Sequence, residues 1–139
     1  LTIHGSNYNK FYGERTQRFA ALRDMIDAGV RACITSDSPS ADANVMRGID
    51  AAVNRRDWQS GEYVGKNQAV SVLEAIRCYT INPAYASFEE KIKGSLEPGK
   101  LADMVIFDRD ILSCPKEELR DVKVDVTIMD GKDVYVREG

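Results

Sequence analysis

The sequence changes character at Gly94, and this change limits the folds that the chain can adopt. Before Gly94, apolar residues recur at helical spacings of three and four, with one short β-prone run among them. After it, short apolar runs are separated by turn sequences that contain glycine or proline. We therefore expect an α/β domain over residues 1–93 and a β-rich domain over residues 94–139.

The first domain contains the pattern of an α/β unit. Apolar spacing predicts a helix over residues 16–28, with its buried face at Phe19, Leu22 and Ile26. Gly29 follows as a stop signal, and residues 30–35 are a β-prone run that predicts a strand. That strand would end at the polar residues 36–39. Residues 1–4 alternate between apolar and polar, which indicates either the end of another strand or a loop that begins abruptly.

Further helices are expected before Gly94. Residues 45–56 are predicted to be helical, and residues 57–68, which are polar and contain two glycines, to be a loop. Ser71 and Glu74 have the spacing of a capping box, so a helix should begin there. This helix is expected to present Leu73, Ile76 and Thr80 on one side. Asn82 precedes a proline, which predicts a new helix with Asn82 as its N-cap.

The second domain contains turn and hairpin signals. Pro98-Gly99 suits the centre of a type II turn, and residues 104–107 predict a buried strand. A single helical turn is expected over residues 114–119. Two apolar runs within residues 126–136 flank Asp130-Gly131, which favours a type I′ turn and therefore predicts a hairpin.

Composition excludes several classes of partner. The formal net charge is −3 and there is no basic run, so nucleic acid is not an expected partner. The apolar runs are too short for a membrane span. Charged residues at 55–57 and 116–118 are expected to be solvated. The cysteines are far apart, which predicts buried or half-buried thiols in a reducing cytosol and hence a cytoplasmic protein; they are Cys33, Cys78 and Cys114.

Three residues are candidates for a functional site. Asp37 follows the predicted strand at its carboxyl end, where a carboxylate can bind a metal or accept a proton; the same sequence is also typical of an ordinary turn or N-cap. His4 is the sole histidine, and a histidine-rich metal site needs at least two, so a surface or hydrogen-bonded role is the alternative. Arg15 suits binding of an anionic group or a solvated position.

Five stretches of the sequence, at residues 13–15, 28–39, 74–90, 94–110 and 124–135, form a recognisable pattern. Together they resemble the amidohydrolase superfamily, specifically amidohydrolase family 3, whose members are YtcJ-like hydrolases. The resemblance implies the C-terminal part of a TIM-type (β/α)8 barrel, followed by strands of a small composite β-sandwich domain. It implies that Asp37 matches the aspartate after the last barrel strand, a metal ligand and proton acceptor. Arg15 matches an arginine expected to contact substrate, and His4 falls in the same loop region.

The resemblance also sets the expected activity. It implies hydrolysis of non-peptide C–N bonds of a small-molecule substrate with zinc or another divalent metal. The family's other ligands have no counterpart here, and 139 residues cannot close a barrel that needs about 250. We therefore expect a C-terminal fragment that is inactive alone, with the missing N-terminal part as its partner and a tendency to self-associate. The alternatives are an inactive scaffold or a freestanding oligomeric binding module.

Overall fold

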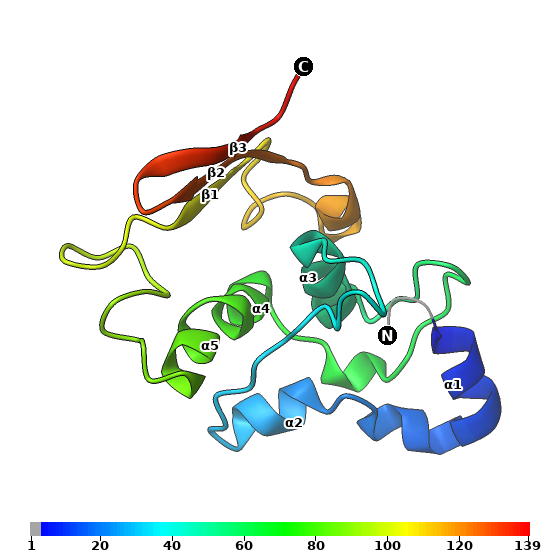
Figure 1. Ribbon diagram of the computed structural model, residues 1–139. Coiled ribbons are helices and arrows are strands. Elements are labelled where there is room, and N and C mark those ends of the chain that lie inside the picture. The colour runs from blue at the N-terminus through cyan, green and yellow to red at the C-terminus, as the bar shows by residue number, and fades with distance from the viewer. Residues whose placement is uncertain (1–3) are drawn as a thin grey trace.

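The computed structural model describes residues 4–139, so most of the strand end predicted at residues 1–4 lies outside the described part of the chain (Figure 1). The helices and strands, with η marking 3-10 helices, are α1 Gly5–Tyr12, η1 Gly13–Arg18, α2 Leu22–Asp27, α3 Val45–Asn54, η2 Lys66–Gln68, α4 Val72–Tyr79, α5 Ile81–Ala86, β1 Met104–Phe107, η3 Lys116–Asp121, β2 Val124–Met129 and β3 Lys132–Val136. The fold is α/β, with the strands and η3 after residue 94 and the other helices before it.

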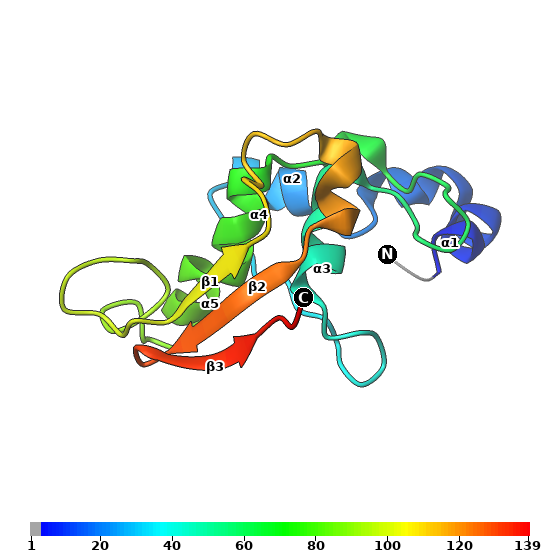
Figure 2. The same ribbon diagram turned by 90° about the horizontal axis from the view of Figure 1, so that it is seen from above.

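The core lies where α3 meets α4 and η3. Residues from these three elements are buried together, among them Met46, Ile49, Val53, Ala75, Cys78 and Leu119. Figures 1 and 2 show the sheet along one side of the helices, with β1 nearest to α4 and α5 and β3 farthest from them. The η3 helix therefore connects the sheet region to the helical core.

Helices α3 and α4 begin at side-chain caps. The Asn44 side chain accepts a hydrogen bond from the Met46 N–H at 2.9 Å, which stabilises the first turn of α3. The capping box of α4 is confirmed, with reciprocal bonds between Ser71 and Glu74. The side of α4 that carries Leu73 is not its most buried one. Leu73 is 47% exposed, and the fully buried residues are Ala75 and Cys78.

Glu74 makes the stability of this cap depend on pH. The Ser71 backbone N–H, helped by Arg23 and the Ser71 hydroxyl, outweighs the opposing effect of burial and lowers the pKa of Glu74 from 4.5 to about 2. Because the folded-state pKa is lower than the unfolded one, this stabilisation is present above about pH 4.5 and is lost as pH falls toward 2.

We expect Glu74→Gln to unfold more easily than the unmodified chain at pH 7, by roughly 1 kcal/mol after allowance for solvent screening. Glutamine can keep the cap bond but not the ion pair, in which Arg23 Nη1 lies 2.8 Å from Glu74 Oε1. Urea unfolding at pH 7 and at pH 3 measures the difference. A difference that stays constant between the two pH values would contradict this assignment.

The strands form one antiparallel sheet in the order β1-β2-β3. The hairpin prediction is confirmed, because Asp130 and Gly131 have φ values of 50° and 72°, as a type I′ turn requires. The Pro98-Gly99 turn is also confirmed. Gly99 has a φ of 92°, and the Lys100 N–H donates to the Glu97 carbonyl at 3.1 Å.

Strand β1 is less buried than predicted. Val105 and Ile106 are 45% and 48% exposed, because no second layer among residues 4–139 covers that part of the sheet. An apolar groove of about 750 Å³ lies between the sheet and the helices, with Met104 and Phe107 on its sheet side and Ile76 and Pro83 on its helix side. The sheet and helices therefore leave apolar surface open between them.

Three local predictions need correction. The helix expected over 16–28 is two shorter helices, η1 and α2, because the chain turns at Ala20, where φ is 45°. Helix α5 begins at Ile81 rather than after Asn82, so Asn82 is not its N-cap. Cys33 is exposed, whereas Cys78 is buried and Cys114 is half-buried, as expected.

Candidate functional site

Residues 31–37 form an irregular segment whose side chains alternate in exposure. Cys33 and Thr35 are exposed on one side, and Ala32 and Ile34 are buried or half-buried on the other. The strand prediction for 30–35 is wrong, because a strand needs a hydrogen-bonded neighbour and the described residues supply none there. One side of the segment is nevertheless directed to the core and the other is left open.

Asp37 lies where this segment turns. Its φ of 58° is left-handed, and its carbonyl accepts the N–H groups of Ser40 at 2.8 Å and Ala41 at 3.3 Å. The Asp37 N–H donates to Thr35 Oγ1 at 3.3 Å. The backbone of Asp37 is thus fixed by local bonds. Its carboxylate has no hydrogen bond or ion pair with any residue that the structure describes.

A cavity of about 450 Å³ lies beside Asp37 and is lined by α3, α4 and the segment from Ala32 to Asp42. His4 also lines it, as does Tyr8, whose ring meets the His4 ring edge-on at 6.3 Å between centroids. Arg15 is exposed on η1 and does not line the cavity. The structure therefore brings together His4 and Asp37 but not Arg15, and the proposed roles of all three stay predictions.

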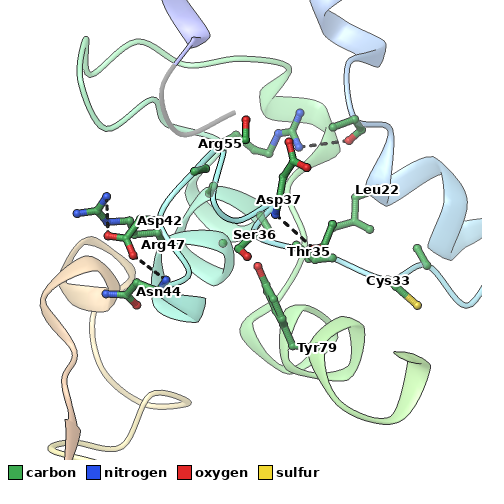
Figure 3. Close-up of a pocket in the computed structure, with 18 of the residues that line it drawn as sticks. Leu22, Cys33, Thr35, Ser36, Asp37, Asp42, Asn44, Arg47, Arg55 and Tyr79 are labelled. Carbon is green, nitrogen blue, oxygen red and sulfur yellow. Dashed lines mark hydrogen bonds and ion pairs between the residues drawn. The ribbon is translucent and has the colours of Figure 1, made fainter. Parts of the chain in front are cut away.

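Most polar side chains labelled in Figure 3 are already satisfied by other parts of the chain. Asp42 pairs with Arg47 at 3.0 Å, and the Asn44 side chain caps α3. Among the labelled polar side chains, those without such a partner are the Asp37 carboxylate and the Tyr79 hydroxyl. Figure 3 shows them on opposite sides of the turn, with Tyr79 rising from α4 toward Ser36. Asp37 is therefore the carboxylate that the cavity leaves available for chemistry.

The burial of Arg55 is not predicted from the sequence, because the charged residues 55–57 are expected to be solvated. Arg55 is 1% exposed, and its guanidinium donates to four backbone carbonyls. These belong to Phe19 at 2.7 Å, Ala20 at 3.3 Å, Val64 at 3.0 Å and Gly65 at 3.1 Å. Burial lowers the pKa of Arg55 to about 10. Arg55 thus joins two distant loops behind the cavity.

Asp57 is also buried, at 2% exposure, and connects the 57–62 loop to the start of α1. Its carboxylate accepts the N–H of Gly5 as well as those of Gln59 and Ser60. Burial alone would raise the pKa of Asp57, but these hydrogen bonds outweigh it and hold the pKa below its ordinary value. His4 precedes Gly5, so the loop fixes the backbone beside His4.

Gly48 makes room for Tyr79. A Cβ atom at position 48 would overlap the Tyr79 hydroxyl and lie 2.7 Å from Tyr79 Cζ. Burial raises the pKa of Tyr79 above its ordinary value, in keeping with the position of this ring between α3 and α4. The close approach of the two helices therefore depends on a residue without a side chain.

We expect Gly48→Ala to lower the free energy of unfolding by about 1 to 3 kcal/mol, although alanine normally favours a helix interior. The reason is the overlap with the Tyr79 ring. Adding Tyr79→Phe removes the hydroxyl and should recover part of the loss, which urea unfolding of the double-mutant cycle measures. A single Gly48→Ala variant more stable than the unmodified chain would show that the helices have spare room.

A divalent metal ion needs more ligands than the residues around Asp37 supply. A protein zinc site uses three or four ligands. Within residues 4–139, no group of three or more His, Cys, Asp or Glu side chains is placed to hold a metal ion. Asp37 has a suitable donor, but these residues do not by themselves fit a divalent metal.

No helix among residues 4–139 is long and apolar enough to cross a bilayer.

Comparison with known proteins shows the family. A model described as the amidohydrolase family matches residues 5–135, so the chain belongs to that family. It is 37% identical over 137 residues to the N-substituted formamide deformylase of Arthrobacter pascens, covering 97% of this chain and 25% of the relative. It is 27% identical over 124 residues to YtcJ of Bacillus subtilis (strain 168), covering 88% and 23%. The resemblance to YtcJ-like amidohydrolases is confirmed.

Two solved structures have a fold similar to that of this chain. An amidohydrolase from Thermotoga maritima MSB8 superimposes with a TM-score of 0.59 at 20% identity, covering 88% of this chain and 26% of that one. A 5-methylcytosine deaminase from Klebsiella pneumoniae superimposes with a TM-score of 0.61 at 22% identity, covering 84% and 27%. The chain spans about a quarter of the length of the curated relatives and the structures described here.

Proposed function

We propose that this chain is the C-terminal part of a hydrolase that cleaves non-peptide C–N bonds, with Asp37 as its proton-transferring carboxylate. The observation on which this proposal depends is the placement of Asp37. Its backbone is fixed by local bonds, while its carboxylate is unpaired beside a cavity in a chain of the amidohydrolase family. A fixed backbone with a free carboxylate is the arrangement that general acid–base chemistry needs.

The proposed substrates are amides with a small acyl group, and N-substituted formamides come first because of the 37% identity to a deformylase of that name. Water adds to the carbonyl carbon, the C–N bond breaks, and formate and an amine are released. Asp37 accepts the proton of the attacking water and delivers it to the leaving nitrogen. Zinc or another divalent metal, held by Asp37 and residues outside this chain, would supply Lewis acidity at the carbonyl and acidify water.

Two features of the fold support the proposal that this chain is part of a larger (β/α)8 barrel and a β-sandwich domain. Residues 31–37 are irregular rather than a strand, but their alternating exposure, with one side toward the helices and the other left open, suits a place on the wall of a (β/α)8 barrel. In this proposal residues 1–93 complete the barrel and residues 94–139 supply strands of a composite β-sandwich. The half-exposed β1 strand and the apolar groove beside it are consistent with a missing layer.

The partners expected for this chain are those that would cover its open surfaces. We expect the N-terminal part of the same protein to cover the open side of residues 31–37 and the sheet. Without it, the exposed apolar residues of the sheet should drive self-association of the isolated chain. The proposed location is the cytoplasm, where free thiols such as those of Cys33, Cys78 and Cys114 stay reduced.

Assay of the full-length protein tests the proposal. Formate release from a series of N-alkyl and N-aryl formamides is measured, with other small amides as a second series. We expect formate and amine in equal amounts, loss of activity after treatment with a chelator, and recovery with Zn²⁺. Residues 1–139 alone should be inactive. A folded full-length protein that binds no metal and releases no amine from either series would favour an inactive scaffold and overturn the proposal.

A further inference from the structure

Two hydrogen bonds hold the irregular segment that precedes Asp37. The Ile34 N–H donates to the Cys78 carbonyl at 3.0 Å, and the Asn82 side-chain amide donates to the Ala32 carbonyl at 2.8 Å. Both partners come from the adjoining ends of α4 and α5. In a sheet, a neighbouring strand would supply both bonds from its backbone. Here a backbone carbonyl supplies one of them and a side-chain amide the other.

The Asn82 side chain is well placed for this role. Asn82 lies in the first turn of α5 and is half-buried, and Ala32 is 9% exposed, so water competes poorly for the Ala32 carbonyl. The same Asn82 nitrogen lies 3.8 Å from the buried Cys78 sulfur. The amide is thus enclosed between the segment and α4. It donates to another segment and does not cap its own helix.

Two anchors two residues apart determine both the position and the direction of a chain segment. With Ile34 alone attached, the segment could pivot about one bond. With Ala32 attached as well, its direction toward the turn is fixed. From there, the local bond between the Asp37 N–H and Thr35 Oγ1 continues the ordered path.

We infer that Asn82 is a positioning residue for Asp37, whose side-chain amide takes the place of a neighbouring strand's N–H and sets the direction of residues 31–37. This inference rests on the proposed function only for the use of Asp37; the positioning itself is a property of the isolated chain. Asn82 does not touch the cavity and acts through the Ala32 carbonyl.

The unmodified chain gives the first test. If the Asn82 amide is held by Ala32, its side-chain protons should exchange with solvent several-fold more slowly than those of the exposed Asn67, as NMR of the full chain measures. This readout needs no variant and therefore does not depend on whether a variant folds. Equal exchange of the two side-chain amides would overturn the inference.

Variants give the second test. Asn82→Ala removes the donor, and Asn82→Asp keeps the size but places a carboxylate against the Ala32 carbonyl. We expect about fivefold faster exchange of the Ile34 N–H in both variants, the effect of one hydrogen bond of ordinary strength. A spin label on exposed Cys33, in a Cys114→Ser background, should become more mobile. Ser87→Ala is the matched control at the C-cap of α5, because the Ser87 hydroxyl bonds only to Pro83, Ala84 and Glu89.

The outcomes are distinct. Faster exchange at Ile34 with unchanged exchange in α3, and no change in Ser87→Ala, supports the inference. Unchanged exchange and label mobility in a folded Asn82→Ala or Asn82→Asp chain overturns it, as does equal loosening throughout the chain. Asp37→Asn should leave these readouts unchanged. Failure of the hydrolase assay would therefore remove the proposed function without removing the positioning role of Asn82.

Discussion

In the full-length protein, Asp37→Asn should lower kcat/KM for an amide substrate by about 10³-fold, within the range that a positioned proton-transfer group contributes. Asparagine keeps the size of the side chain but cannot accept the proton of the attacking water. The free energy of unfolding should change little, because the carboxylate makes no hydrogen bond or ion pair with a described residue and the backbone bonds of Asp37 do not involve its side chain. Formate release and urea unfolding measure the two effects separately.

Asp42→Asn is the matched control for this experiment. Asp42 lines the same cavity, but its carboxylate is paired with Arg47 at 3.0 Å, so it is not available to take a proton. We expect its kcat/KM to stay within about threefold of the unmodified protein, the range of a modest exposed ion pair. Turnover by Asp37→Asn equal to that of Asp42→Asn would remove Asp37 from the mechanism.

Arg55→Met should lower the free energy of unfolding by about 3 kcal/mol, because it leaves the Phe19 and Val64 carbonyls without a donor and removes one of the two donors from each of the Ala20 and Gly65 carbonyls. The four carbonyls belong to two loops that are far apart in sequence, at Phe19-Ala20 and Val64-Gly65. Methionine fills much of the space but donates to none of them. Urea unfolding followed by circular dichroism measures the loss.

Arg55→Lys and Arg56→Met show whether the guanidinium geometry is responsible. Lysine keeps the charge but lacks the planar fork, so we expect it to recover less than half of the loss. Arg56 is the exposed neighbour, with a single bond to the Gly61 carbonyl, and its replacement should cost less than about 0.5 kcal/mol. An Arg55→Met chain within 1 kcal/mol of the unmodified one would contradict the role given to these bonds.

The features that could be predicted from sequence are those decided by neighbouring residues. The Asp130-Gly131 turn needs two residues that accept positive φ, and the sequence supplies them. The capping box needs two side chains three residues apart, at Ser71 and Glu74. The polar residues 36–39 end the β-prone run and Asp37 lies in a turn there, but the strand expected before it does not form, and the role of Asp37 stays a prediction.

The features that were missed depend on residues distant in sequence. Whether residues 30–35 form a strand depends on a neighbour that residues 4–139 do not provide. Arg55 looks like a solvated charge until the loops at 19–20 and 64–65 surround it. Asn82 has a typical N-cap sequence, but its amide instead bonds Ala32, 50 residues earlier. Local patterns do not contain this information.

The loop that begins at Asp57 holds the start of α1 in position through hydrogen bonds. Asp57 holds the Gly5 N–H, and the Asn9 side chain bonds both Glu62 and the Tyr63 carbonyl at 3.0 Å. We expect substitutions in this loop to shift His4, which lines the cavity, without replacing any cavity-lining residue. Two proteins with the same cavity-lining residues would then differ in the shape of the cavity, so the 57–63 loop is a remote determinant of that shape.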